Sequence, residues 1–411
     1  MSEQEFFDDL ETRDPEARER DLMAALAAQI AHAKSNSSYF GTTLADVDAA
    51  AINNRQALAA LPVTRKSDLV EHQAALPPFG GLNGVPVGEA AYVYQSPGPI
   101  YEPGGHGDFW RMGRSFWSAG IRPGDIVHNT FSYHLTPAGR MMEGGAHALG
   151  CPVFPGGVGN TEQQIAAIAH LQPAAYAGTP SFLKILLEKS AEAGVKHAYR
   201  SAAVGGEALP PSVRKDINDH GVNVLQGYGT ADLGLIAYES NAKEGMILDE
   251  HVVVEILRPG SGDPVADGEV GEVVVTVLAP TYPLIRFATG DLSAIMAGQS
   301  PCGRTNQRIK GWMGRADQTT KVKGMFVHPA QVNQTAARHS EIKKARLVVD
   351  GTGGRDVMTL KCEVDGPADG LAAAIAESIQ AVCKLRGEVE LVDVGSLPND
   401  GKVIDDVRTY E

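Results

Sequence analysis

The chain has few cysteines, and they are not arranged as a disulfide or zinc framework. Its 411 residues contain four of them, Cys151, Cys302, Cys362 and Cys383, and no two form a CxxC pair. Such spacing supplies neither a set of metal ligands nor a disulfide pattern. We therefore expect reduced thiols and a cytoplasmic protein.

The chain also has no surplus of basic residues and no long apolar run. Asp and Glu number 50 against 36 Lys and Arg, which gives a formal net charge of −14. Nucleic acids and anionic membranes bind basic surfaces, so we expect neither as a partner. No apolar run reaches the roughly 18 residues of a membrane span. The polar, acidic N-terminus does not resemble a signal peptide.

What the sequence does contain is an alternation of strand and helix patterns. Between about residues 90 and 230, short apolar runs such as "DIVHNTF", "CPVFP", "AAYAG" and "SAAVGG" alternate with helical stretches such as "TPSFLKILLEKSAEAG". This alternation predicts an α/β fold with largely parallel sheets covered by helices. Further upstream, Asp14 and Pro15 are typical of a helix start, and Leu22, Leu26 and Ile30 follow at helical spacing.

The character of the chain changes after Gly245. The runs "VVVEIL", "GEVVVTVL" and "PLIRF" predict antiparallel strands separated by Gly-rich turns. Past Lys323 the pattern predicts strands near 345–349, 358–364 and 388–392, and a helix over 370–384. We expect a large N-terminal domain of layered sheets and helices over 1–314, with a β-rich subdomain at about 246–314. A small, mobile α+β C-terminal domain would follow over 315–411.

One glycine- and proline-rich stretch, "YQSPGPIYEPGG" at 94–105, follows the apolar run "AYVY" and precedes a helix predicted from about Asp108 to Ala119. A small-residue loop between a strand and a helix is typical of phosphate binding through backbone N–H groups. Pro97 and Pro99 remove two of those donors, however, and Glu102 adds a negative charge. The context therefore favours a phosphate loop, whereas the chemistry of these residues does not.

Nearly the whole chain resembles the phenylacetate–coenzyme A ligase branch of the acyl-adenylate-forming enzymes. The motifs that carry the resemblance follow one another in the family's order: "LPVTRKSDL", "GIRPGDIVHNTFSYHLTPAG", "PGGVGNTEQQ", "AGTPSFL", "GGEAL", "YGTADLG", "YPLIRFATGDL", "GRADQTTKVKGMFVHPAQV" and "LPNDGKVIDDVR".

The resemblance implies a two-step reaction. A carboxylate attacks the α-phosphate of ATP to give an acyl-adenylate and pyrophosphate, and the thiol of coenzyme A then displaces AMP. The C-terminal domain swings about a short hinge between the two steps. The expected ligands are ATP or AMP, Mg²⁺, coenzyme A and a small carboxylic acid, and a homodimer is usual for the family.

The resemblance also assigns roles to residues. Lys402 would be catalytic, neutralising the charge that develops between carboxylate and α-phosphate. Asp232 stands where the family has its magnesium glutamate, and an Asp keeps the hard oxygen ligands that Mg²⁺ prefers. The hinge and the coenzyme A loop would contain Asp317, Lys323 and Gly324. The expected nucleotide-binding residues are Gly205, Gly206, Glu207, Gly227, Tyr228, Gly229, Thr230, Arg286, Asp291 and Arg315.

A further set of residues matches the wall of the family's acyl pocket. Aromatic and apolar walls with a few polar groups suit a small, partly apolar acid. His134 lies among them, but a lone histidine is more often a pocket or core residue than a catalytic base. The matching residues are Phe131, Tyr133, His134, Leu135, Thr136 and Ala203.

Two departures from the family pattern concern phosphate and zinc. In the altered phosphate loop only Ser96, Gly98 and Pro103 agree with the family, and Glu102 replaces its lysine. The family's Cys and His zinc ligands are also absent, because Ser240 and only one cysteine, Cys302, occupy the matching region. A structural zinc needs four ligands, so we expect none.

These observations leave three functions open. The first is an ATP-dependent, AMP-forming acid–coenzyme A ligase for a small, aromatic or otherwise compact carboxylic acid. The second is an acyltransferase that uses coenzyme A without ATP. The third is a non-catalytic pseudoenzyme that binds a ligand through a degenerate phosphate loop.

Overall fold

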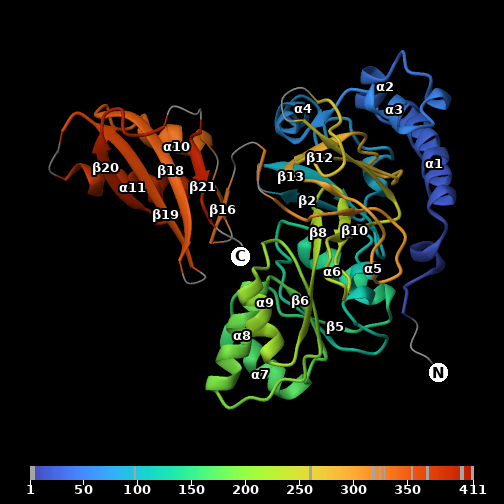
Figure 1. Ribbon diagram of the computed structural model, residues 1–411, viewed down its shortest axis with the longest axis horizontal. Helices are drawn as coiled ribbons and strands as arrows, with labels where there is room; N and C mark the ends of the chain where they lie inside the picture. The colour runs from blue at the N-terminus through green and yellow to red at the C-terminus, as the bar shows by residue number, and fades with distance from the viewer. Residues whose placement is uncertain are drawn as a thin grey trace. The chain divides into compact units, whose positions relative to one another are not determined.

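The computed structural model describes residues 5–96, 99–258, 262–313, 315–316, 320–323, 325–327, 329–352, 355–366, 370–398 and 402–408. The chain forms two compact units, Met1–Gly314 and Arg315–Glu411, and both are drawn in Figure 1. Among the described residues, no helix has both the length and the apolar character needed to cross a membrane.

A nine-stranded sheet forms the centre of the first unit, in the order β14-β15-β10-β9-β8-β7-β6-β4-β5. Neighbours from β5 to β8 pair in parallel and those from β8 to β14 are antiparallel, so β8 joins the two halves. The parallel half confirms the predicted α/β class. The strands are β4 Val127–Asn129, β5 Val153–Pro155, β6 Ala175–Gly178, β7 Ser201–Val204, β8 Asn223–Thr230, β9 Gly234–Tyr238, β10 Met246–Leu248, β14 Ile295–Met296 and β15 Arg308–Ile309.

Helices cover both faces of the parallel half. On one face, Tyr176, Ala202 and Val224 pack against α7, α8 and α9, which lie together in Figure 1. On the other face, Ala175, Ala203 and Leu225 share a core with α5 and α6. Alternate residues of a strand point to opposite faces, which explains why these strands are apolar throughout. The helices are α5 Gly113–Ser118, α6 Ala138–Ala148, α7 Thr161–Leu171, α8 Pro180–Glu192 and α9 Pro211–Asp219.

A second sheet of the same unit has the strand order β1-β13-β12-β11. Its apolar face shares a core with the N-terminal helices, including Leu26, Ile30 and Phe40. As the sequence predicted, the first long helix begins at Pro15, and Asp14 caps it by accepting a hydrogen bond from the N–H of Ala17. The elements are β1 Thr64–Arg65, β11 Val252–Leu257, β12 Gly271–Val277, β13 Phe287–Ser293, α1 Pro15–Asn36, α2 Ser38–Thr43, α3 Arg55–Ala59 and α4 Leu69–Ala75.

The glycine- and proline-rich stretch is a β-hairpin. Strand β2 (Tyr92–Ser96) pairs antiparallel with β3 (Ile100–Gly104), so Tyr94 stands opposite Glu102 and Ser96 opposite Ile100. Pro97 and Gly98 lie outside the described residues. The sequence predicted the first strand of this pair but not the second.

Helix α5 begins at Gly113, later than the predicted start near Asp108. The side chain of Asp108 accepts hydrogen bonds from the backbone N–H groups of Met112 and Gly113, each at 2.7 Å. Arg111 has φ +63°, a conformation that a right-handed helix excludes. A similar shift affects "PLIRF", because the strand in that region, β13, begins only at Phe287.

The second unit contains a four-stranded sheet of order β20-β19-β18-β21 and a hairpin of β16 and β17. Its core joins Leu347 and Leu360 of the sheet to Ile375 and Ile379 of α11. The elements are β16 Thr320–Val322, β17 Met325–Val327, α10 Pro329–Ala336, β18 Ile342–Thr352, β19 Arg355–Val364, α11 Leu371–Cys383, β20 Glu388–Asp393 and β21 Ile404–Asp406.

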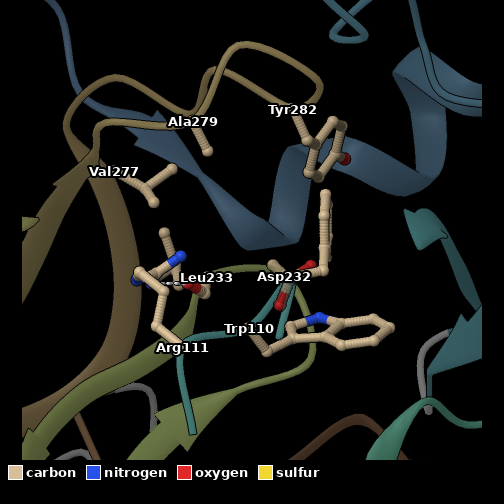
Figure 2. Close-up of a pocket in the computed structure, with 8 residues that line it drawn as sticks. Trp110, Arg111, Asp232, Leu233, Val277, Ala279 and Tyr282 are labelled. Carbon is tan, nitrogen blue, oxygen red and sulfur yellow. Dashed lines mark hydrogen bonds between the residues drawn. The ribbon is translucent and has the colours of Figure 1, made fainter. Parts of the chain in front are cut away.

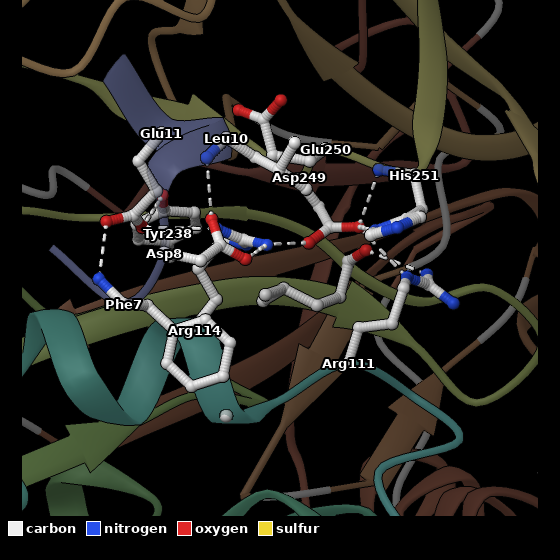
Figure 3. A network of polar contacts seen from close by, with 12 residues as sticks. Phe7, Asp8, Leu10, Glu11, Arg111, Arg114, Tyr238, Asp249, Glu250 and His251 are labelled. Carbon is white, nitrogen blue, oxygen red and sulfur yellow. Dashed lines mark hydrogen bonds and ion pairs between the residues drawn. The ribbon is translucent and has the colours of Figure 1, made fainter. Parts of the chain in front are cut away.

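Figure 3 shows a polar network that ties the N-terminal segment to the region around α5. Arg114 donates two hydrogen bonds to Asp8, each at 2.8 Å, and Tyr238 donates one to Glu11 at 2.7 Å. Arg111, just before α5, donates to Asp249 at 2.9 Å. Burial alone would raise the pKa of Asp8, but its hydrogen bonds with Arg114 and the charge of that residue hold the pKa below its ordinary value. The network therefore anchors the N-terminal end of the short helix.

Candidate active site

A cavity of about 160 Å³ lies between helices α5 and α6 and the carboxyl ends of strands β7 and β8. Ligands of open α/β sheets usually bind at the carboxyl ends of the strands. The cavity is lined by Ser96, Met112, Ser115, Phe116, Phe131, Thr136, Pro137, Ala138, Met141, Met142, Ala203, Val204, Gly205, Gly206, Gly227, Gly229, Thr230 and Ala231.

Five of the expected nucleotide-binding residues line this cavity, namely Gly205, Gly206, Gly227, Gly229 and Thr230. Residue 229 has no room for a side chain. A Cβ added there would lie 2.4 Å from the carbonyl oxygen of Gly234, so a side chain would push β8 away from β9. Bare backbone therefore borders the cavity at the end of β8.

Tyr228 and Asp291 lie together next to this glycine-rich strand end. The Tyr228 hydroxyl donates to Asp291 Oδ2 at 2.9 Å, and Trp312 Nε1 donates to Asp291 Oδ1 at 3.0 Å. The Asp291 carboxylate is buried. Each oxygen of a carboxylate can accept more than one hydrogen bond, so this arrangement orients Asp291 and leaves it able to accept from hydroxyl groups.

The structure does not support a nucleotide role for Arg286. Its guanidinium is buried and forms two hydrogen bonds with Glu255, at 3.0 and 3.1 Å. The remaining nitrogen donates to the carbonyl oxygens of Ala59 and Leu61. These contacts join the N-terminal helical region to the second sheet, so Arg286 is a structural residue.

Glu207 also has a structural contact. Its Oε1 accepts a hydrogen bond of 2.8 Å from the backbone N–H of Ser181, in the first turn of α8. A carboxylate at a helix N-terminus satisfies free N–H groups and interacts favourably with the helix dipole.

The expected acyl-pocket residues divide into two groups. Phe131, Thr136 and Ala203 line the cavity, whereas Tyr133, His134 and Leu135 do not. His134 is exposed, and Leu135 is 71% exposed with φ +63°. The structure therefore does not bring His134 and Leu135 to the wall of this cavity.

The sequence analysis missed the side chains that α5 and α6 contribute to the cavity. Met112, Ser115 and Phe116 come from the start and body of α5, and Met141 and Met142 from α6. A signal was present, because Met112 and Phe116 are spaced as one face of a helix. Such an apolar helix face is typical of an ordinary buried core. Nothing in the sequence indicated that this face borders an open cavity.

An ion pair between distant parts of the chain lies near the hairpin that carries the expected phosphate loop. Lys66 Nζ lies 2.5 Å from Asp232 Oδ2, and the Asp232 side chain has no exposed area. Ser96 Oγ donates to Glu102 Oε2 at 3.1 Å, in the hairpin that carries the altered loop. Both Ser96 and Glu102 are buried.

The charge of Glu102 is lower than its residue type suggests. Burial, together with the nearby negative charge of Asp232, raises the pKa of Glu102 to about 8. At neutral pH the carboxyl is therefore mostly protonated, and Lys66 balances Asp232. The sequence predicted a charge reversal at this position, but in the structure the Glu102 carboxyl is mostly uncharged, and the charges of Lys66 and Asp232 offset each other.

The donors around Asp232 suit a magnesium ion that also binds substrate phosphates. Mg²⁺ is usually held by one or two carboxylates together with phosphate oxygens and water. Asp232 Oδ1 and Glu102 Oε1 are buried and have no hydrogen-bond partner among the described atoms. Figure 2 shows the other side of Asp232, where a cavity of about 10 Å³ has room for roughly one water. Asp232 thus fits as a magnesium ligand through Oδ1, although Lys66 engages its other oxygen.

The region that matches the family's zinc site is held by hydrogen bonds. Cys302 Sγ accepts from Ser300 Oγ at 3.1 Å and from Arg304 Nη1 at 3.7 Å. Arg304 also pairs with Glu11 at 3.1 Å, within the network around Tyr238. Within the described parts of the chain, no group of three or more His, Cys, Asp or Glu residues could hold a metal ion.

The expected catalytic and hinge residues of the second unit are described in part. Lys402 is exposed and donates to Asp405 Oδ1 at 2.9 Å. Lys323 has φ +48° and forms the turn between β16 and β17, where its N–H donates to Asp356 at 2.6 Å. Arg315 is half-buried. Asp317 and Gly324, like Gly98 of the altered loop, lie outside the described residues.

Comparison with known proteins agrees with this geometry. The AMP-binding enzyme family matches residues 106–277. The chain is 32% identical over 341 residues to a phenylacetate-coenzyme A ligase of Thermus thermophilus, covering 79% of this chain and 76% of the relative. It is 28% identical over 369 residues to that of Escherichia coli strain K12, covering 83% of both.

The solved structures include a similar fold. A crystal structure of 2-hydroxyisobutyryl-CoA ligase in complex with 2-HIB-AMP and CoA has a TM-score of 0.82 and 25% identity. The match covers 98% of this chain and 92% of that one. The identity and coverage of the relatives show that this chain belongs to the AMP-binding enzyme family, among the AMP-forming acyl–coenzyme A ligases that resemble phenylacetate–coenzyme A ligase.

Proposed function

We propose that the protein is an ATP-dependent, AMP-forming acid–coenzyme A ligase whose substrate is a compact carboxylic acid, about one aromatic ring in size. The cavity between α5, α6 and the ends of β7 and β8 is the observation that carries this proposal. Its volume of about 160 Å³ is close to that of an engineered apolar cavity of roughly 150 Å³ that binds benzene. Larger acids would not fit without movement of the walls.

The role that we assign to each part of the site follows from its position. The acyl body occupies the apolar part of the cavity, against Phe116, Phe131 and Met141. Its carboxylate lies toward the bare backbone of Gly205, Gly206 and Gly229, where a nucleotide phosphate can approach closely. Asp291, oriented by Tyr228, accepts hydrogen bonds from the ribose hydroxyls.

Two further roles complete the proposal. Lys402, on the C-terminal unit, neutralises the charge that develops at the reacting carboxylate and α-phosphate. The unit 315–411 rotates about its hinge between adenylation and thioester formation. When bound, Mg²⁺ supplies charge neutralisation for the phosphates, and the residue that would hold it is Asp232, through Oδ1.

The test is product formation by the full-length protein. A pooled set of one-ring and branched short acids is incubated with ATP, Mg²⁺ and coenzyme A, and AMP and acyl–coenzyme A are measured together. We expect both products in equal amounts, and a loss of at least 100-fold in Lys402→Ala, since removing one electrostatic stabiliser typically costs about that much. Acyl–coenzyme A formation without AMP would contradict the ligase assignment.

One observation favours a second function, an acyltransferase that acts on coenzyme A thioesters without ATP. The residue that replaces the family's phosphate-loop lysine is a buried carboxyl beside Asp232, and Lys66 is already paired with that Asp. None of these groups offers a free cation to a triphosphate. Transfer of coenzyme A from an acyl–coenzyme A thioester to a second carboxylic acid, with release of the first acid and no dependence on ATP, would support this function over the first. Binding of an acid without turnover in either assay would leave the non-catalytic alternative.

A further inference from the structure

We propose that Ser115 selects the substrate by hydrogen bonding to a polar substituent, a hydroxyl or amino group, on the body of the acid. This inference rests on the proposed ligase function and narrows its substrate class. Ser115 lies on α5 and lines the 160 Å³ cavity. The expected substrate is therefore a hydroxylated or aminated compact acid, and the unsubstituted parent is a poor one.

Ser115 is a buried residue, and its hydroxyl is available for hydrogen bonding. The residue is 5% exposed, and no hydrogen bond to its Oγ is found within the described parts of the chain. A serine in a helix commonly donates to the carbonyl four residues earlier. That carbonyl belongs to Arg111, whose φ of +63° places it before the helix proper, where such a contact is not made.

The other side chains that line the cavity are mainly apolar. Met112, Phe116 and Met141 surround it. The lining has three other hydroxyls. Ser96 donates to Glu102 at 3.1 Å, and Thr230 Oγ1 accepts from the N–H of Leu233 at 3.1 Å. The third belongs to Thr136, which is only half-buried. A polar group on the acid that reaches Ser115 therefore finds a partner with unused hydrogen-bonding capacity.

The position of Ser115 is fixed before any ligand binds. Its neighbour Arg114 forms the pair of 2.8 Å hydrogen bonds with Asp8, and Arg111 is held by Asp249 and by the carbonyl of Leu233. Asp8, Arg111, Arg114 and Asp249 are labelled in Figure 3. Facing the hydroxyl, Gly227 contributes no side chain, and a Cβ there would come within 3.2 Å of Ser115 Oγ. The space in front of the hydroxyl thus exists because residue 227 is a glycine.

The physical consequence is discrimination against unsubstituted acids. A buried hydroxyl that loses its water on ligand binding and gains no partner is unfavourable. Sites built to bond a substrate hydroxyl reject the analogue that lacks it far more strongly than an apolar pocket rejects an added group. We expect a preference of about 10-fold to 100-fold for the substituted acid.

The test compares substituted acids with their unsubstituted parents. It also compares a variant of Ser115 with a variant of a second serine on the same helix. The full-length protein is assayed for thioester formation with phenylacetate, benzoate and their ring-hydroxylated and ring-aminated isomers, and kcat/KM is determined for each. Wild type, Ser115→Ala and Ser118→Ala are compared. Ser118 lies on the same helix, but its hydroxyl donates to the carbonyl of Glu239 at 2.8 Å, so it controls for loss of a serine from α5.

We expect the preference of wild type for its best substituted acid to fall to within about threefold of unity in Ser115→Ala, and to persist in Ser118→Ala. A preference that Ser115→Ala leaves unchanged, or wild-type activity restricted to unsubstituted acids, would overturn the inference while leaving the ligase function intact. If wild type forms thioester with no acid of the set and calorimetry detects binding of none, the proposed function fails, and the inference fails with it.

Discussion

The ammonium group of Lys66 lies 2.5 Å from the Asp232 carboxylate, although the two residues are 166 positions apart in the sequence. The pair lies beside Glu102, the acidic residue that replaces the lysine of the family's phosphate loop. A positive charge thus remains at the phosphate end of the site, but it comes from a different segment and is engaged by the expected magnesium ligand.

The first prediction concerns the contribution of this pair to stability. Lys66→Met leaves the fully buried Asp232 without its counter-charge, and breaking a buried pair in this way costs about 2–4 kcal/mol when one partner is partly exposed. The free energy of unfolding in urea at pH 8 measures it. Lys184→Met is the matched control, because Lys184 also lies 2.5 Å from a carboxylate, that of Asp216, but on the surface. We expect the control to lose less than about 1 kcal/mol. Equal losses would show that burial of Asp232 has no energetic role.

The second prediction concerns pH. The folded pKa of Glu102, about 8, lies above the ordinary value of 4.5, so the folded state holds a proton that the unfolded chain releases. The stabilisation is complete below about pH 4.5 and is lost as pH rises through 8. Glu102→Gln should therefore match wild type near pH 5 and exceed it at pH 9, by about 3 kcal/mol.

The free energy of unfolding in urea, measured at the two pH values, tests this prediction. Glu188→Gln, at an exposed position, is the control for general charge effects. If the difference in unfolding free energy between wild type and Glu102→Gln does not change with pH, then Glu102 is ionised throughout. Its carboxyl would then not be neutral at pH 7.

The third prediction separates structure from binding at Arg286. Arg286→Lys keeps a charge but loses the two-pronged contact with Glu255 and at least one contact with the carbonyls of Ala59 and Leu61. We expect a loss of about 2–3 kcal/mol in unfolding free energy. The affinity of the folded variant for AMP should stay within twofold of wild type by calorimetry. A tenfold weaker affinity at unchanged stability would restore the nucleotide role.

The sequence predicted the elements whose signals are local. Asp14 and Pro15 start α1, the stretch "TPSFLKILLEKSAEAG" contains α8, and the apolar runs at 175–178 and 201–204 are strands. Each follows from capping chemistry or periodicity within a few residues.

The features that the sequence did not predict depend on contacts between distant residues or on single backbone angles. The start of α5 is delayed by Asp108 and by φ +63° at Arg111, and the second strand of the hairpin forms around residues that read as a loop. The ion pair of Lys66 with Asp232 and that of Arg286 with Glu255 are not visible in any local sequence pattern. The same reason explains why Ser115 was overlooked, since its importance depends on the glycine that faces it from β8.

The most direct test of the central claim is calorimetric titration of the purified full-length protein with ATP and Mg²⁺, which needs no knowledge of the acid. We predict binding with Kd at or below 1 mM, weakened at least tenfold in Asp291→Ala, which corresponds to the loss of about 1.4 kcal/mol or more. That result would show that the site still accepts a triphosphate despite Glu102. No detectable binding of ATP, in a folded sample that does bind coenzyme A, would contradict the ligase assignment and favour the ATP-independent transferase.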